Sequence, residues 1–292
     1  MDFKFYKFDG AGNDFVIIDS RDRELGLTAD QIARVCHRRF GVGADGLMLL
    51  TDGGEEYDFR MTYYNSDGHT AEMCGNGGRC IAMFAYLLGM GSAGKPYLGQ
   101  EPDRGFSIAY NFGMLQAQEE MARPRLYFLA SDGPHDAEII QWDETGQMGL
   151  VKLGMRDVER DSIVRVLDGY LLNTGVPHYV QKVSDLEHYD VAGEGRRLRH
   201  HPELGSEGAN VNFIEEQPDG TLLVRTYERG VEDETWACGT GVTACAIVTG
   251  NQRLATRGGN FRVDFCRSMD CFTKVYLTGP VSLNFTGKYR MN

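Results

Sequence analysis

Two of the seven cysteines stand directly before short glycine-rich runs. Cys74 precedes Gly75-Asn76-Gly77, and Cys238 precedes Gly239-Thr240-Gly241. Each run opens an apolar segment that is predicted to be helical, and the N–H groups and dipole of a helix start favour a thiolate. The glycines also allow a ligand carboxylate to approach those N–H groups. We therefore expect an anion site beside a reactive thiol at each cysteine.

Two such thiols on opposite sides of one α-carbon are suited to racemisation or epimerisation. One thiolate removes the α-proton, and the opposite thiol returns a proton to the other face. The substrate carboxylate takes up the developing charge against preorganised N–H donors. This chemistry needs no pyridoxal phosphate, so no cofactor is expected.

The elements around the two cysteines form an internal repeat. Residues 62–77 and 225–241 share the order strand, polar turn, cysteine and helix start. The helical segments 81–88 and 242–249 are apolar on every side, which places each of them inside a domain. The sequence therefore predicts an α/β (α+β) fold of two similar domains. In each, a sheet wraps around one buried helix, and the two domains are expected to face each other.

Composition and charge restrict the partners. The chain has 292 residues, 42% of them hydrophobic, and a formal net charge of −12. This length favours two domains of roughly 130 to 150 residues each. The acidic balance and the lack of basic runs argue against nucleic acid. The longest apolar stretch, residues 81–90, is about half a membrane span, so no membrane association is expected.

The N-terminus reads as a strand and not as an export signal. We therefore expect a cytoplasmic protein whose cysteines, odd in number, are free thiols. Strands are predicted at 4–8 and 15–19. A helix is predicted at about 29–40, begun by a capping box of Thr28 and Gln31 and stopped by Gly41. Further strands are expected at 125–130, 137–142, 149–154, 163–172, 178–183, 209–215, 221–228, 261–265, 272–278 and 281–286.

Several motifs together resemble the diaminopimelate epimerase family, and they cover nearly the whole chain. They are Gly10 to Phe15, Tyr64 to Gly68, Ala71 to Gly77, Gly175 to His178, Gly208 to Phe213, and Glu228 to Gly241. The resemblance implies two similar domains, residues 1–155 with Cys74 and residues 156–279 with Cys238. Each is expected to be a mixed, barrel-like sheet around a central helix, with the active site in the cleft between the domains. The resemblance also implies that the last strand, 280–292, returns to the first domain and that the protein is a homodimer.

The resemblance carries roles to individual positions. Cys74 and Cys238 resemble the two catalytic bases, supported by His178 and Glu228. The resemblance implies that the distal amino-acid head of the substrate is bound by a clamp of five residues, Asn13, Asn65, Asn210, Glu228 and Arg229. It also implies that the reacting carboxylate is bound by Gly75, Asn76, Gly239 and Thr240. The implied reaction interconverts LL- and meso-diaminopimelate, for lysine synthesis and, in some organisms, for cell-wall precursor.

Two other functions remain open at this point. A proline-racemase-like epimerase shares the fold and the two cysteines, although Asn76, Arg79 and the run 228–230 suit a distal amino-acid head better. A non-catalytic thiol protein that binds metal or senses oxidants is the other. The spacings from Cys74 to Cys80 and from Cys238 to Cys245 are not those of a zinc site, so no metal is expected.

Three features depart from the family pattern. Val176 stands where many members carry asparagine, so Asn173 or backbone is expected to replace that amide. The loop from Arg229 to Cys238 is one residue longer than the commonest form. The segment 89–124 is also long, and we interpret it as a surface excursion.

Overall fold

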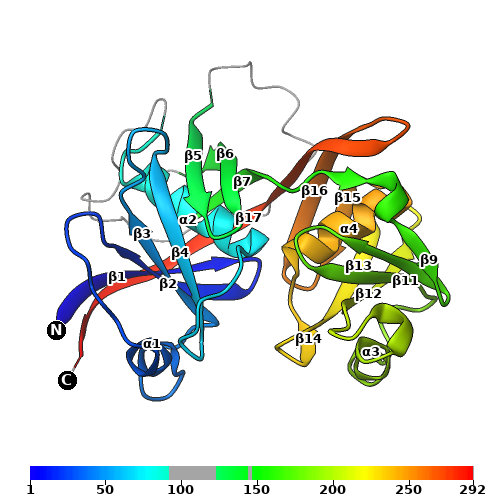
Figure 1. The fold of residues 1–292 in the computed structure, drawn as a ribbon, viewed down its shortest axis with the longest axis horizontal. Coiled ribbons are helices and arrows are strands. Elements are labelled where there is room, and N and C mark those ends of the chain that lie inside the picture. The colour runs from blue at the N-terminus through cyan, green and yellow to red at the C-terminus, as the bar shows by residue number, and fades with distance from the viewer. Residues whose placement is uncertain (92–122, 144–146, 292) are drawn as a thin grey trace. The chain divides into compact units, whose positions relative to one another are not determined.

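The structure is a computed structural model that describes residues 1–91, 123–143 and 147–291. Most of the predicted excursion at 89–124 lies outside the described residues. The rest of the chain forms two compact units (Figure 1). Unit 1 comprises residues 1–10, 14–153 and 280–292, and unit 2 comprises residues 11–13 and 154–279. Within the described residues, no helix has the length and apolar character needed to cross a membrane.

Both units are mixed α/β structures. The elements of unit 1, in chain order, are β1 (Asp2–Gly10), β2 (Asn13–Asp19), α1 (Ala29–Cys36), β3 (Gly46–Thr51), β4 (Phe59–Asn65), α2 (Gly75–Leu87), β5 (Arg125–Ala130), β6 (Gly133–Trp142) and β7 (Met148–Gly154). Those of unit 2 are β8 (Val158–Glu159), η2 (Arg160–Ser162), β9 (Val164–Val166), β10 (Gly169–Asn173), β11 (Pro177–Lys182), α3 (Val191–Arg199), η3 (Pro202–Leu204), β12 (Asn210–Glu216), β13 (Leu222–Glu228), β14 (Asp233–Thr235), α4 (Gly239–Thr249), β15 (Arg253–Thr256) and β16 (Gly259–Arg267). The last strand, β17 (Cys271–Arg290), begins in unit 2 and ends in unit 1.

The strand pairing confirms the internal repeat. In unit 1, β2 is parallel to β3, β3 antiparallel to β4, β4 parallel to β5, and β5 antiparallel to β6. In unit 2, the same alternation runs through β11, β12, β13, β15 and β16. A helix follows the first strand of each set, and the cysteine-bearing helix follows the third. The repeat in the sequence is therefore a repeat of topology.

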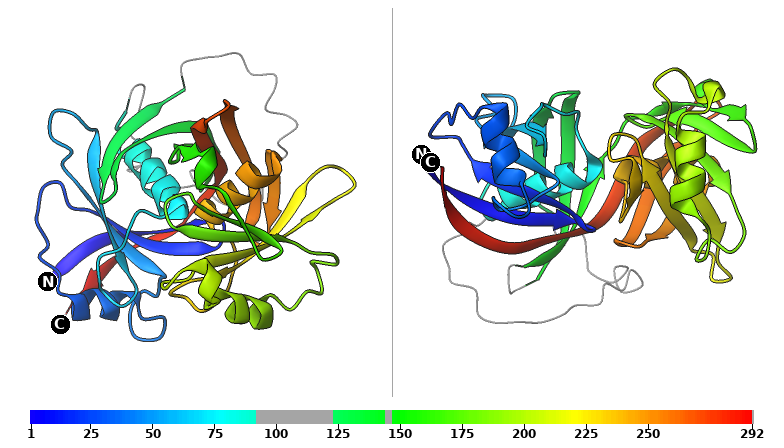
Figure 2. Two further views of the ribbon diagram at one scale, coloured as in Figure 1. Left: turned by 45° about the vertical axis from the view of Figure 1, so that its right-hand side comes forward. Right: turned by 90° about the horizontal axis from the view of Figure 1, so that it is seen from below.

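The cysteine-bearing helices are buried, as their composition predicts. From Cys80 to Ala85 every residue of α2 is fully buried, and from Val242 to Ala246 the same holds for α4. Strands β1, β3 and β6 contact α2. Helix α4 contacts β10, β11, β12, β13, β15 and β16. Figure 2 shows α2 among the strands of unit 1. Burial on all sides leaves only the helix ends available to a ligand.

The final strand differs from its prediction. Residues 271–290 form one continuous strand in place of two runs at 272–278 and 281–286. It pairs with β16 up to Thr278 and with β1 from Ser282 onward. Gly279 and Pro280 stand where the strand changes partner from β16 to β1. The two chain ends meet beside β1, where the Met1 amino group donates to the Met291 carbonyl at 2.9 Å.

Two helices differ from the sequence prediction. Helix α1 has the predicted capping box of Thr28 and Gln31 but ends at Cys36, not near residue 40. The Nδ1 atom of His37 accepts from the N–H groups of Arg39 and Phe40, which satisfies them outside the helix. Helix α3 was not predicted, because its glycines weaken helix propensity.

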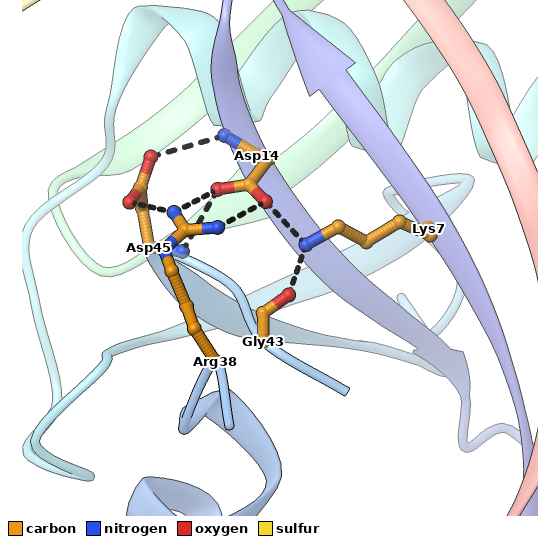
Figure 3. Close-up of polar contacts among 5 residues, drawn as sticks. All are labelled: Lys7, Asp14, Arg38, Gly43 and Asp45. Carbon is orange, nitrogen blue, oxygen red and sulfur yellow. Dashed lines mark hydrogen bonds and ion pairs between the residues drawn. The ribbon is translucent and has the colours of Figure 1, made fainter. Parts of the chain in front are cut away.

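An ion network in unit 1 joins the start of β2 to the end of α1 (Figure 3). The Lys7 ammonium, which is 5% exposed, donates to Asp14 Oδ2 at 2.5 Å and to the Gly43 carbonyl. Arg38 donates to both Asp14 oxygens at 3.0 and 2.7 Å and to Asp45 at 2.6 Å. Burial would raise the pKa of Asp14, but the hydrogen bonds from Arg38 and Lys7 lower it to about 2. The network holds the start of β2, the strand that begins at Asn13.

Asp14→Asn should destabilise the protein by about 3 kcal/mol, because it leaves the buried Lys7 ammonium without its carboxylate. The free energy of unfolding in urea, followed by circular dichroism at pH 7, measures this loss. Asp19→Asn is the matched control, since the Asp19–Arg21 pair is also short, at 2.6 Å, but more exposed. The control should change stability by less than about 1 kcal/mol. Equal losses in the two variants would contradict the role given to Lys7.

Candidate active site

Each candidate cysteine is the N-cap residue of a buried helix. Cys74 caps α2 and Cys238 caps α4, both with extended backbone. The first helical bonds are equivalent, from Gly78 N–H to the Cys74 carbonyl at 2.7 Å and from Val242 N–H to the Cys238 carbonyl at 2.8 Å. In an α-helix the N–H groups before this bond have no partner within the helix. The donors and the dipole therefore lie beside both thiols, as the sequence predicts.

In unit 1, a buried arginine orients the residues after Cys74. Arg79 is fully buried and donates to the Gly75 carbonyl at 3.1 Å and to Asn76 Oδ1 at 2.9 Å. Burial lowers the pKa of Arg79 to about 10, so the guanidinium still carries its charge at neutral pH. Because Oδ1 of Asn76 accepts from Arg79, the amide has a fixed orientation. From the sequence, Arg79 is related only to a distal amino-acid head, and this role is missed; its signal is an arginine inside a glycine-rich helix start.

Gly10 allows the chain to pass this close to Asn76. A Cβ atom at Gly10 would lie 2.8 Å from the Asn76 carbonyl oxygen. The remaining candidate in unit 1, Asn65, is exposed at the end of β4. Its backbone N–H donates to the His69 carbonyl and its carbonyl accepts from Gly68, so it opens a turn.

In unit 2, His178 is linked to Cys238 through a threonine hydroxyl. Nε2 of His178 lies 2.9 Å from Thr240 Oγ1, and that oxygen lies 3.4 Å from Cys238 Sγ. His178 has no exposed surface. Burial and, to a smaller extent, the charge of Arg229 lower the pKa of His178 to about 3. The imidazole is therefore neutral at physiological pH and acts as a hydrogen-bonding group.

The long loop before Cys238 forms a short hairpin that orders the predicted clamp. Strand β14 pairs with the end of β13, with Glu228 opposite Asp233. Glu228 Oε1 accepts from the Thr235 hydroxyl at 2.5 Å. The Arg229 N–H donates to Asn210 Oδ1 at 2.7 Å. Three clamp candidates of unit 2, Asn210, Glu228 and Arg229, therefore lie at one end of the sheet.

Asn13 is part of unit 2 although it lies near the start of the chain. The preceding Gly12 has a φ of +88°, and a Cβ atom there would lie 2.9 Å from Trp236 Cβ. The loop therefore packs directly on the residue two positions before Cys238. At the departure from the family pattern, Val176 is half-buried, and Asn173 Oδ1 accepts from Gly175 N–H at 2.9 Å. Asn173, one of the two expected replacements, thus stabilises its own turn.

Solved structures of low sequence identity define the class of fold. A probable proline racemase from Agrobacterium radiobacter K84 has a TM-score of 0.66 at 13% identity, covering 99% of this chain and 93% of that chain. A PhzF-family phenazine biosynthesis protein from Bacillus anthracis has a TM-score of 0.63 at 14% identity, and the match covers 100% of both chains. The chain has the fold that these proteins share, as expected from the repeat.

Sequence similarity identifies the particular family. The sequence model of the diaminopimelate epimerase family matches residues 5–96 and 170–269 of this chain. A diaminopimelate epimerase from Flavobacterium psychrophilum is 37% identical over 295 residues, which cover 97% of this chain and 98% of the relative. The chain belongs to the diaminopimelate epimerase family. It is an epimerase, which confirms the resemblance and the enzyme class predicted from the motifs.

Acid should destabilise the protein through His178. Because the pKa falls from 6.5 in the unfolded chain to about 3 in the folded protein, the unfolded chain binds the proton more readily. The stabilisation is complete above pH 6.5 and is lost as the pH falls toward 3, by about 5 kcal/mol in total. Urea unfolding at pH 7, 5 and 4 should show a smaller loss for His178→Gln than for the wild type. The control His69→Gln, at an exposed site, should keep the wild-type slope.

Proposed function

We propose that the protein interconverts LL- and meso-diaminopimelate without a cofactor, using Cys74 and Cys238 as the two bases. The observation that carries this proposal is the pair of cysteines at the N-caps of two buried, glycine-flanked helices. Membership of the diaminopimelate epimerase family and the name of its relative support the substrate. A racemisation at one α-carbon requires two acid–base groups, and the repeat supplies one in each unit.

The reaction conserves all atoms and needs no redox partner. The thiolate of one cysteine takes the α-proton, and the electron pair moves into the substrate carboxylate. The other cysteine, as a thiol, then gives its proton to the opposite face of the carbon. The mechanism requires both sulfur atoms at one α-carbon, one on each side. The negative charge of the intermediate is matched to N–H donors at Gly75, Asn76, Gly239 and Thr240.

The distal amino-acid head of diaminopimelate would bind to a set of polar side chains. We assign this head to Asn13, Asn65, Asn210, Glu228 and Arg229. Glutamate offers a partner for the ammonium group, and arginine and asparagine offer donors for the carboxylate. Thr235 and the Arg229 backbone already hold Glu228 and Asn210, which reduces the entropy cost of binding. Proline has no second head group, so this clamp favours diaminopimelate.

The proposal extends to the pathway, the compartment and the oligomeric state of the protein. The proposed product serves L-lysine biosynthesis by the diaminopimelate pathway, in the cytoplasm, with the protein acting as a homodimer. The catalytic domains would be residues 1–155 with the returning strand 280–292, and residues 156–279. His178 and Glu228 would support proton transfer at the cysteines without binding a metal. Among the described residues, no group of three or more His, Cys, Asp or Glu side chains is arranged to hold a metal ion.

Cys74→Ala and Cys238→Ala should each lower epimerisation of diaminopimelate by at least about 100-fold, because each removes one acid–base group. The assay is conversion of LL- to meso-diaminopimelate, with deuterium incorporation at the α-carbon followed by NMR in D₂O. Cys266→Ser is the control, since Cys266 is exposed and lies on β16. It should retain wild-type activity.

The substrate is tested in the same assay with proline in parallel. Exchange with diaminopimelate alone supports the proposed function. Exchange with proline alone would move the protein to the proline-racemase branch, and an active Cys74→Ala or Cys238→Ala enzyme would refute the two-base mechanism.

A further inference from the structure

A buried asparagine next to His178 has an orientation that the structure fixes. Nδ2 of Asn212 donates to the Tyr179 carbonyl at 3.0 Å, and Oδ1 accepts from the Thr226 hydroxyl at 2.9 Å. A backbone carbonyl accepts only, so the amide nitrogen must face Tyr179. Asn212 is fully buried and Thr226 is 3% exposed. The amide therefore has one orientation, and its nitrogen also lies 3.2 Å from His178 Nδ1.

Helix α4 makes room for this asparagine at a glycine. A Cβ atom at Gly241 would lie 2.3 Å from Asn212 Oδ1 and 3.3 Å from His178 Cε1. Any other residue at position 241 would displace Asn212 or His178. Gly241 thus leaves space for the Asn212 amide, in addition to leaving the N–H groups of the helix start open to a ligand.

The orientation of Asn212 sets the tautomer of His178. Because the Asn212 nitrogen is a donor, Nδ1 of His178 must accept. A neutral imidazole has one N–H, so the hydrogen lies on Nε2. That N–H then donates to Thr240 Oγ1, 2.9 Å away. Since Thr240 receives a hydrogen bond from His178, its own hydroxyl hydrogen remains available for Cys238 Sγ at 3.4 Å.

We propose that Asn212 and Thr226 are positioning residues that hold His178 in the Nε2–H tautomer, so that Thr240 donates a hydrogen bond to the Cys238 thiolate. A thiolate accepts only, and this donor stabilises it. A hydroxyl that accepts one hydrogen bond is a stronger donor of the next, so the row of hydrogen bonds from Asn212 through His178 and Thr240 to Cys238 is cooperative. With the hydrogen on Nδ1 instead, Nε2 would accept from Thr240 and take this donor away from sulfur. The inference rests on the proposed role of Cys238 as a base.

The test is the ionisation of Cys238, which can be measured without epimerase activity. In a Cys74→Ala background, the rate of alkylation of Cys238 by iodoacetamide is followed against pH by mass spectrometry of its peptide. Asn212→Asp replaces the donor by an acceptor and should raise the midpoint for Cys238 by about 1 pH unit, the effect of losing one hydrogen bond to a charged group. Thr240→Val should raise it by a similar amount.

The combination of variants separates a linked row from independent effects. If Asn212 acts through Thr240, the double variant should show no larger shift than Thr240→Val alone. Thr243→Val is the control, because Thr243 lies on the same helix and donates to the Gly239 carbonyl instead. It should leave the midpoint unchanged. An unchanged midpoint in Asn212→Asp, or additive shifts in the double variant, would overturn the proposal.

A measurement on the unmodified protein covers the case in which a buried variant does not fold. ¹⁵N NMR at pH 7 should show Nδ1 of His178 as the bare nitrogen and Nε2 as the protonated one; the reverse pattern would refute the inference. In the active enzyme, Asn212→Asp should also move the acidic limb of the kcat/KM profile to higher pH. Absence of exchange with diaminopimelate in the wild type would refute the proposed function alone, since the tautomer and the thiol titration are measured independently.

Discussion

The structure depends on the enclosure of one apolar helix in each unit. Helices α2 and α4 present hydrophobic side chains in every direction, so strands must surround them. A helix satisfies its own backbone except at its ends, and the first N–H groups are therefore the only backbone donors that such a buried helix can offer. The cysteines and glycines stand at those ends. The constraint that shapes each core thus also places helix-start N–H groups beside a thiol.

Equivalent positions of α2 and α4 carry side chains of different charge. Arg79 and Thr243 each stand five residues after a candidate cysteine, and each donates to the carbonyl of the residue that follows the cysteine. The arginine brings a buried positive charge into the start of α2, whereas the threonine leaves the start of α4 neutral. In unit 2 a row of neutral hydrogen bonds from Asn212 to Thr240 lies against the cysteine instead. The two equivalent helix starts are therefore bonded by different groups.

Much of the local structure around the candidate site was predictable because its signals are local. The capping box at Thr28, the glycines after Cys74 and Cys238, and the apolar helices all lie within a few residues of what they determine. Two element ends differ from their predictions. The end of α1 depends on a local competitor for backbone donors, the imidazole of His37. Strand β17 remains one strand because two partners distant in sequence pair with it in succession.

The sequence by itself determined the repeat, the buried helices, the positions of the thiols and, through the motifs, the family. It also marked His178 as a site residue, but its neutral charge and its contacts come from tertiary structure alone. Parallel pairing of β11 with β12 brings Asn212 beside the histidine, and the helix start brings Thr240 to its other nitrogen. Pairing register and burial bring together residues more than 30 positions apart, and no local pattern encodes which nitrogen carries the hydrogen.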